Sequence, residues 1–208
     1  MANGVTALVT PPIELAHDRE GDSGALIGRC KAGDLEAFDE LMQVWGARVL
    51  RLAGHLLRRP SDAEDAAQAT FLRLYRALDR LDDDRPLWPY LSRITVNVCR
   101  DLQQSHARLR RVEVDEDGLT RGAEPESIEP GPERIAVARQ QHRRLVRLLG
   151  RLTEQERACL VLRELEGHSS AEVAEILGSS QTTVRSHISR GRLKLRRMLT
   201  ETGELHDD

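Results

Sequence analysis

Apolar residues recur at three- and four-residue spacing through two long stretches of the chain, and this period constrains the fold more than any other feature. The first stretch begins near Ala25 and continues to residue 112, and the second spans residues 134–200. Such spacing gives an α-helix one apolar stripe, whereas a half-buried strand needs strict alternation. β-Branched residues are also sparse, while Leu, Ala and Arg dominate. The sequence therefore predicts an all-α protein built from two small helical domains.

The remaining segments lack this periodicity. Residues 113–133 carry eight acids against one base, together with several Pro and Gly residues and few large apolar side chains. A segment of that composition cannot bury a core, so it predicts a flexible acidic linker. Residues 1–24 are expected to form a disordered leader and residues 201–208 an acidic tail.

Three Ser or Thr residues are each followed, three positions later, by Glu. This is the pattern of a capping box, in which each side chain bonds a backbone N–H of the other residue. Pro60 is expected to end one helix and Pro89 to occupy the first position of another. The three pairs predict helix starts at Ser61 with Glu64, Thr153 with Glu156, and Ser169 with Glu172.

The charges are segregated along a chain whose formal net charge is only −3. Residues 85–112 hold six bases against one acid, and residues 178–200 hold six bases and no acid. A phosphate backbone responds to the local field within about 8–10 Å rather than to the overall charge. The sequence therefore predicts two positive faces on which a polyanion could lie.

Residues 169–197 have the pattern of a helix-turn-helix: a short helix, a tight turn at "GSS" and a longer helix. Ser180 is the expected N-cap of the second helix, and Val184, Ile188 and Leu195 are its expected buried side. Hydroxyl groups and arginines at the start of such a helix suit the major groove, where Arg forks onto guanine. These groove residues are Thr182, Thr183, Arg185, Ser186, Ser189 and Arg190; the residues expected on the DNA backbone are Arg192, Lys194, Arg196 and Arg197.

This segment has two other interpretations. A basic helix face is often only solvated, although the helix-turn-helix pattern argues against that here. His187 lies between Ser186 and Ser189, but residues this close in a helix point in different directions and no acid orients the histidine. We therefore expect no catalytic site. A helix-turn-helix alone indicates only duplex DNA binding, so an autonomous transcriptional regulator remains the alternative.

The first domain carries aromatic residues beside basic and amide side chains. Unpaired bases stack on aromatic rings while their phosphates require positive charge, so this grouping suits single-stranded nucleic acid. Both rings could equally belong to the core, and the sequence leaves that open. The residues are Trp88, Tyr90, Arg93, Asn97 and Arg100.

The cysteines give no sign of a disulfide framework or a metal site. Cys30, Cys99 and Cys159 are far apart and odd in number, and no CxxC pair occurs. We expect buried thiols in a reducing cytoplasm, with no metal and no cofactor. No apolar run approaches the roughly 20 residues that a membrane span needs, so membrane insertion is not expected.

Three segments, in order, carry a family resemblance: "DAEDAAQATFLRLYRAL" (62–78), "YLSRITVNVCRD" (90–101) and "LTEQERACLVLRELEGHSSAEVAEILGSSQTTVRSHISRGRLKLRRML" (152–199). With them the chain resembles the extracytoplasmic-function (ECF, group IV) sigma factors of bacterial RNA polymerase, within the sigma-70 family. The resemblance implies a non-enzymatic subunit that binds core polymerase and directs promoter-specific initiation. It identifies residues 25–112 with region 2 and residues 134–200 with region 4.

The resemblance also implies roles for individual residues. Region 2 would dock on the β′ clamp helices through Asp62, Asp65, Gln68 and Phe71. The loop and helix from Asp84 to Asn97 would recognise and open the −10 element, with one base flipped into a loop pocket, and Arg100 would contact the same element. Tyr90 stands where the family usually has Trp. Region 4 would bind the β flap and read the −35 element of promoter DNA, and such factors are often held inactive by an anti-sigma factor.

Overall fold

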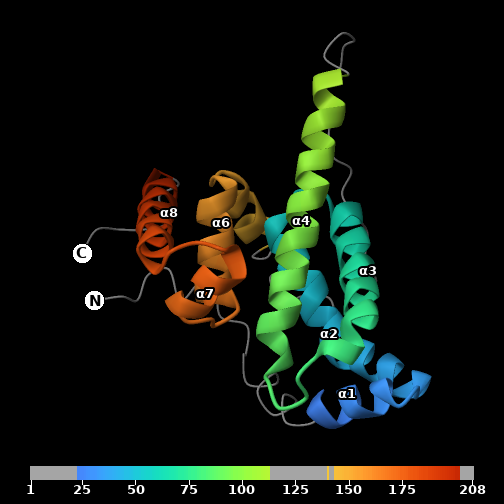
Figure 1. The fold of residues 1–208 in the computed structure, drawn as a ribbon. Helices are drawn as coiled ribbons and strands as arrows, with labels where there is room; N and C mark the ends of the chain where they lie inside the picture. The colour runs from blue at the N-terminus through green and yellow to red at the C-terminus, as the bar shows by residue number, and fades with distance from the viewer. Residues whose placement is uncertain (1–22, 113–139, 141–142, 202–208) are drawn as a thin grey trace. The chain divides into compact units, whose positions relative to one another are not determined.

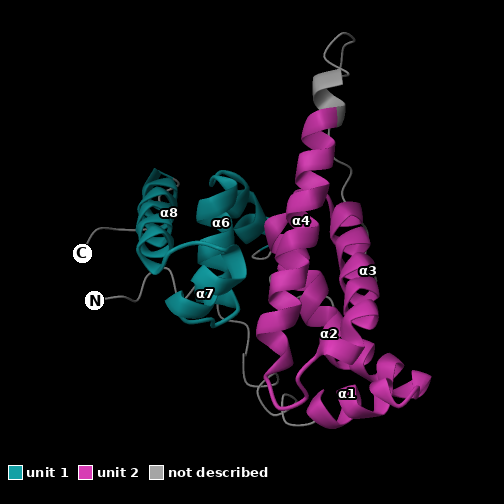
Figure 2. Ribbon diagram, viewed as in Figure 1, with its two compact units in different colours: residues 1–15, 128–208 teal, residues 16–127 magenta. Residues whose placement is uncertain are grey.

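The computed structural model describes residues 23–112, 140 and 143–201. These residues form two compact units, one containing helices α1 to α4 and the other containing helices α6 to α8 (Figure 2). The predicted linker at 113–133 lies outside the described residues, as does the predicted leader up to residue 22. Ser23 and Gly24 are already helical, so the leader prediction was two residues too long.

Every regular element in the described ranges is helical, which confirms the all-α prediction. The first unit contains α1 (Ser23–Lys31), α2 (Leu35–Leu56), α3 (Pro60–Ala77), the 3₁₀ turn η3 (Leu78–Arg80) and α4 (Leu87–Val112). The second contains helical residues 143–150, α6 (Glu154–Leu160), the π-helical turn η4 (Val161–Leu165), α7 (Ser170–Leu177) and α8 (Gln181–Glu201).

In the first unit, α2, α3 and α4 pack side by side, and α1 covers one end of α2 (Figure 1). Leu41, Leu52, Leu74 and Leu91 are fully buried between them. Thr70 is also buried, and its hydroxyl donates to the Ala66 carbonyl 2.7 Å away, so its polar atom is satisfied. The apolar stripes predicted for these helices are thus the surfaces that form the core.

The second unit has an aliphatic core with no aromatic side chain among its described residues. Val161, Leu162 and Val184 are fully buried there. Gly191 lets α8 approach α6 closely, because a Cβ atom at this position would lie only 2.6 Å from Leu160 Cδ1. A side chain at residue 191 would therefore force the buried Leu160 side chain to move.

Two of the predicted helix starts in the first unit were wrong. Helix α3 begins at Pro60, and its N-cap is Arg59 without a side-chain hydrogen bond, so Ser61 caps nothing. Proline fixes φ near its helical value and lacks an N–H that would be unpaired in the first turn anyway. For the same reason α4 starts at Leu87 and tolerates Pro89 as its third residue.

The three cysteines are free and buried, as predicted. Burial raises the pKa of the Cys99 thiol to about 12. That thiol therefore stays protonated and behaves as a small apolar side chain.

Candidate nucleic-acid interface

The turn between α7 and α8 is built by three local features. Ser169 and Glu172 form the predicted capping box, with bonds of 2.7 and 3.2 Å, and they start α7. Gly178 ends α7 in the left-handed region at φ 62°. Ser180 then caps α8, because its Oγ accepts from the Thr183 N–H at 3.1 Å. The helix-turn-helix predicted from the sequence is confirmed in its geometry.

Helix α8 presents the predicted groove residues to solvent. Val184, Ile188 and Leu195 are buried beneath it, as expected. The Thr183 hydroxyl lies 2.9 Å from Ser180 Oγ and so contributes to the cap. The exposed residues of this face are Thr182, Thr183, Arg185, Ser186, Ser189, Arg190 and Arg192.

A hollow of about 540 Å³ lies along the same face of α8. Arg163 of η4 and Ser170 of α7 line it opposite the α8 arginines, and sequence reasoning missed both. The Arg163 guanidinium donates to the His168 carbonyl at 3.0 Å, which holds its side chain near the turn. Nothing in the local pattern marks Arg163, since it reaches this face only through the packing of η4 against α7. The hollow is lined by Arg163, Ser170, Arg185, Ile188, Ser189, Arg192, Leu193 and Arg196.

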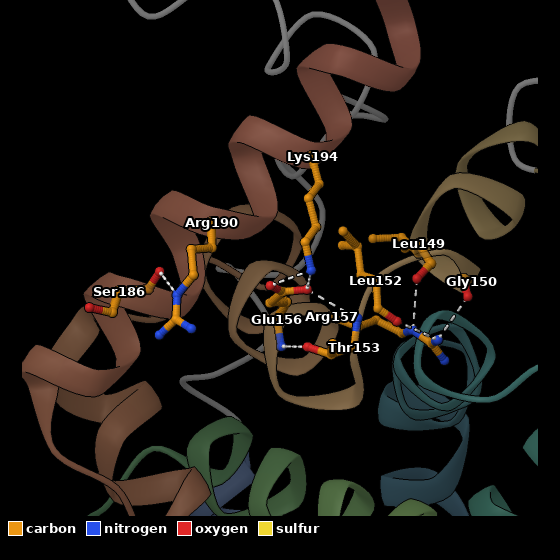
Figure 3. Close-up of polar contacts among 9 residues, drawn as sticks. All are labelled: Leu149, Gly150, Leu152, Thr153, Glu156, Arg157, Ser186, Arg190 and Lys194. Atoms are coloured by element: carbon orange, nitrogen blue, oxygen red, sulfur yellow. Dashed lines mark hydrogen bonds and ion pairs between the residues drawn. The ribbon is translucent and has the colours of Figure 1, made fainter.

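Two of the basic residues predicted to contact the DNA backbone have acidic partners within the protein. Arg192 lies 2.6 Å from Glu164, and Lys194 donates to both carboxylate oxygens of Glu156 at 2.8 Å (Figure 3). Lys194 thus ties α8 to α6, a contact that the sequence did not reveal. Arg192 remains about half exposed and keeps donors toward solvent.

Glu156 combines this ion pair with a capping box. Its backbone N–H donates to Thr153 Oγ1 at 3.3 Å, and its carboxylate accepts from the Thr153 N–H at 3.1 Å. Burial acts to raise the pKa of Glu156, but the bonds from Lys194 and from Thr153 outweigh it and hold the pKa below its usual value. The carboxylate is therefore ionised and anchors the start of α6 to the middle of α8.

Arg157 performs a structural role that its charge does not suggest. It is buried, and its guanidinium donates to the carbonyls of Leu149, Gly150 and Leu152 at 2.9, 3.3 and 3.3 Å (Figure 3). These carbonyls lie at and just beyond the end of the helical segment 143–150, where regular i to i+4 partners end, although the Leu149 carbonyl also accepts the Leu152 N–H at 3.1 Å. Arg157, a residue of α6, thus caps the C-terminal end of the helical segment 143–150.

Of the five residues predicted to contact the −10 element, four are at least partly exposed and one is buried. Arg93 and Asn97 are exposed on α4, and Tyr90 and Arg100 are half-buried. Trp88 is only 2% exposed and belongs to the core, which is the alternative that the sequence left open. Its ring stacks on Trp45 at 5.6 Å with an interplanar angle of 7°, and the Arg48 guanidinium lies 3.9 Å from it. Because it is buried, the Trp88 ring is not accessible to a base in this structure.

The predicted polymerase-binding residues of α3 also differ in exposure. Asp65 and Gln68 are exposed, whereas the Asp62 side chain is mostly buried and lies 3.4 Å from His106 Nδ1. Phe71 is 8% exposed and lies on the buried side of α3, and its part in polymerase binding stays a prediction. The apolar side chains on the outer face are instead Leu72 and Tyr75, which the sequence analysis missed.

Within the described ranges, no group of three His, Cys, Asp or Glu residues could hold a metal ion. None of the helices in this part of the chain combines the length and the apolar composition that crossing a bilayer requires.

Two family models match the chain. Residues 32–109 match a model described as Sigma-70 region 2, and residues 142–195 match one described as Sigma-70, region 4. The first match contains α2 to α4, apart from the end of α4, and the second contains the helix-turn-helix.

Two relatives align with most of the chain. The chain is 36% identical over 179 residues to RNA polymerase sigma factor NccH of Alcaligenes xylosoxydans xylosoxydans, covering 84% of this chain and 93% of that protein. It is 31% identical over 189 residues to ECF RNA polymerase sigma factor SigM of Mycobacterium tuberculosis, covering 91% and 90%.

Solved structures show the same fold. The structure of CnrH in complex with the cytosolic domain of CnrY matches with a TM-score of 0.63 and 28% identity, covering 86% of this chain and 97% of CnrH. RpoE in complex with the anti-sigma factor NepR from Bartonella quintana matches with a TM-score of 0.60 and 22% identity, covering 78% and 96%.

Proposed function

The chain belongs to the ECF sigma factors of RNA polymerase, and from this premise we propose that it reads promoters with α8 at the −35 element and with α4 and its preceding loop at the −10 element. As a sigma factor it binds core RNA polymerase and directs promoter-specific transcription initiation. It acts by recognition and catalyses no reaction itself, and it works where the polymerase is, in the cytoplasm. The observation that carries the proposal is the occurrence of both sigma regions, in order, in one chain.

The −35 element binds the exposed face of α8. Support comes from the arginines and hydroxyl groups on that face and from the hollow that Arg163 lines beside them. Arginine can donate to both guanine O6 and N7, whereas serine and threonine bond bases or phosphates. Arg185, Ser189 and Arg190 read base edges, and Arg192 and Arg196 contact the backbone.

The −10 element binds the exposed side of α4 and the loop that precedes it. Arg93 and Asn97 face solvent there, and Arg85 and Pro86 are exposed in the loop. Tyr90 is half-buried, so its exposed edge serves as the aromatic contact for an unpaired base. Arg100 lies nearly three turns beyond Tyr90 in α4 and contacts the strand backbone. Trp88 supports the loop from below rather than stacking on DNA.

Core polymerase binds the outer face of α3, through the β′ clamp helices. Asp65 and Gln68 supply polar contacts, and Leu72 and Tyr75 supply an apolar surface that is about half exposed. An aromatic anchor ringed by polar groups is typical of protein interfaces. Phe71 and Asp62 contribute by fixing this helix against its neighbours. Region 4 binds the β flap as the second contact with polymerase.

A further partner is an anti-sigma factor. CnrH was solved with the cytosolic domain of CnrY, and RpoE with the anti-sigma factor NepR. The similarity of this chain to CnrH in fold and sequence supports an equivalent inhibitory partner here.

Run-off transcription with core polymerase tests the function. The purified chain should give promoter-specific transcripts only when core enzyme is present. Duplex binding without such transcription would instead support an autonomous helix-turn-helix regulator.

Two arginine substitutions test how α8 reads DNA. Arg185→Ala should weaken binding by about 1–3 kcal/mol and relax discrimination at one −35 position, because a bidentate base contact is lost. Arg197→Ala, near the end of the same helix, should weaken binding equally on all sequences. Binding assays on −35 variants distinguish the two, and a uniform loss for Arg185→Ala would assign it to the phosphate backbone.

A further inference from the structure

The loop at 81–86 connects η3 to α4, and helix α1 holds its first half. Lys31, the last residue of α1, donates from Nζ to the Leu81 carbonyl at 2.6 Å and to Asp83 Oδ1 at 2.5 Å. These bonds join residues 50 and 52 positions apart in the chain. The Lys31 side chain is 26% exposed and that of Asp83 40%, so the contact is partly shielded from solvent.

The face of α1 that contacts loop 81–86 carries two glycines and therefore little side-chain volume. Gly24, Gly28 and Lys31 are spaced four and three residues apart and so share one helix face. A Cβ atom on Gly24 would lie 2.6 Å from the backbone oxygen of Asp83. On Gly28 it would meet only Asp83 Oδ2, at an ordinary contact distance of 3.9 Å. The loop backbone therefore rests directly on Gly24.

The remaining part of the loop is also fixed. Asp82 accepts the Asp84 N–H on its side chain at 3.2 Å and the Arg85 N–H on its carbonyl at 3.3 Å. Beyond the loop, Trp88 stacks on Trp45, whose Nε1 donates to Ser23 Oγ of α1 at 3.1 Å. Both ends of the loop are thus connected to α1, while Asp84, Arg85 and Pro86 remain exposed between them.

We infer that α1 is a positioning element for −10 recognition, in which Gly24 and Lys31 set the conformation of loop 81–86. This rests on the proposed role of the loop in reading the −10 element. Extruding a base from the duplex costs a few kcal/mol, which contacts with the loop must offset. A loop that is ordered before DNA binds loses less conformational entropy on binding, so its contacts offset more of that cost. Lys31 also offsets one acid in a loop whose three consecutive aspartates would otherwise repel the DNA. The region 2 model matches residues 32–109, so Gly24, Gly28 and Lys31 lie outside the matched part of the chain.

A matched pair of glycine substitutions tests the inference with full-length protein and core polymerase. Gly24→Ala should slow promoter opening at saturating holoenzyme on the order of tenfold, because the methyl group displaces the loop backbone. Gly28→Ala changes helix propensity in the same direction but should open promoters like the unsubstituted protein. Opening is followed by 2-aminopurine fluorescence at the −10 element, and affinity for core polymerase should stay within about twofold for both variants.

Lysine substitutions provide a second readout that does not depend on packing. Lys31→Met should slow opening about threefold and flatten discrimination among the four bases at the flipped position, as expected for a partly exposed ion pair. Lys31→Arg retains the charge and should recover most of the opening rate and the base preference.

The possible outcomes separate this inference from the proposed function. Equal opening by Gly24→Ala and Gly28→Ala, or equal defects in Lys31→Met and Lys31→Arg, would overturn the positioning role. Arg85→Ala at the exposed loop tip tests the loop itself. If it leaves −10 base preference unchanged, the assignment of the loop to the −10 element is wrong. If Arg85→Ala alters that preference while the α1 variants do not, only the inference about α1 fails.

Discussion

The two units of this chain are stabilised in different ways. All six aromatic residues lie within residues 25–112, and the α1–α4 core is organised around the stacked rings of Trp45 and Trp88. The α6–α8 unit has an aliphatic core, and its helix ends are set by the Thr153 and Ser169 capping boxes and by the Ser180 cap. Short-range caps thus set most helix ends of the α6–α8 unit, whereas the helices of both units are held together by contacts between distant residues, such as Lys194 with Glu156.

This difference matches the functions proposed for the two units. A duplex reader needs one helix held at a fixed angle, which short-range caps and a close α6–α8 contact at Gly191 supply. A unit that accepts unpaired bases needs a preformed loop, and long-range contacts from α1 and α2 supply that.

The largest effect should come from opening a cavity in the α1–α4 core. Leu52→Ala should lower the free energy of unfolding by about 2–5 kcal/mol, because Leu52 is fully buried. Leu50→Ala, two residues away in α2 and 41% exposed, should cost much less. Urea unfolding followed by tryptophan fluorescence measures this, since both tryptophans lie in this unit. Similar losses for the two leucines would contradict the packing described for α2.

The α6–α8 unit should depend instead on a single buried carboxylate. Glu156→Gln retains a capping-box side chain but removes the charge that Lys194 pairs with, and it should cost about 1–2 kcal/mol at neutral pH. Native-state hydrogen exchange of the buried amides of α8 reports this loss. Glu154→Gln is the control, because Glu154 lies exposed in the same first turn.

The loss should also depend on pH. The pKa of Glu156 is held below its ordinary value of 4.5, so the folded state binds the proton less readily than the unfolded state. The stabilisation is complete above the ordinary pKa and disappears as the pH falls through the lowered one. The difference between the native protein and Glu156→Gln should therefore shrink in acid, and a difference that persisted there would have another origin.

The success of sequence reasoning followed the same division between the units. The helix-turn-helix was predicted correctly because Ser169, Gly178 and Ser180 act on backbone groups within one turn. Trp88, whose place the sequence leaves open, and Phe71 are both buried, because burial is decided by which helices pack together. Arg163 and the pairing of Lys194 with Glu156 were missed for that reason as well, since both depend on contacts with other helices.

The smallest predicted effect compares two serines with the same sequence pattern. Ser169→Ala should destabilise α7 by about 1 kcal/mol, because it removes the acceptor for the Glu172 N–H. Ser61→Ala should change the stability of α3 by less than about 0.5 kcal/mol, since Ser61 is exposed and the helix is capped at Arg59. Hydrogen exchange of the first-turn amides in each helix measures both changes. Equal losses would mean that α3 starts at Ser61 in solution, and that the capping pattern specifies helix starts in both units.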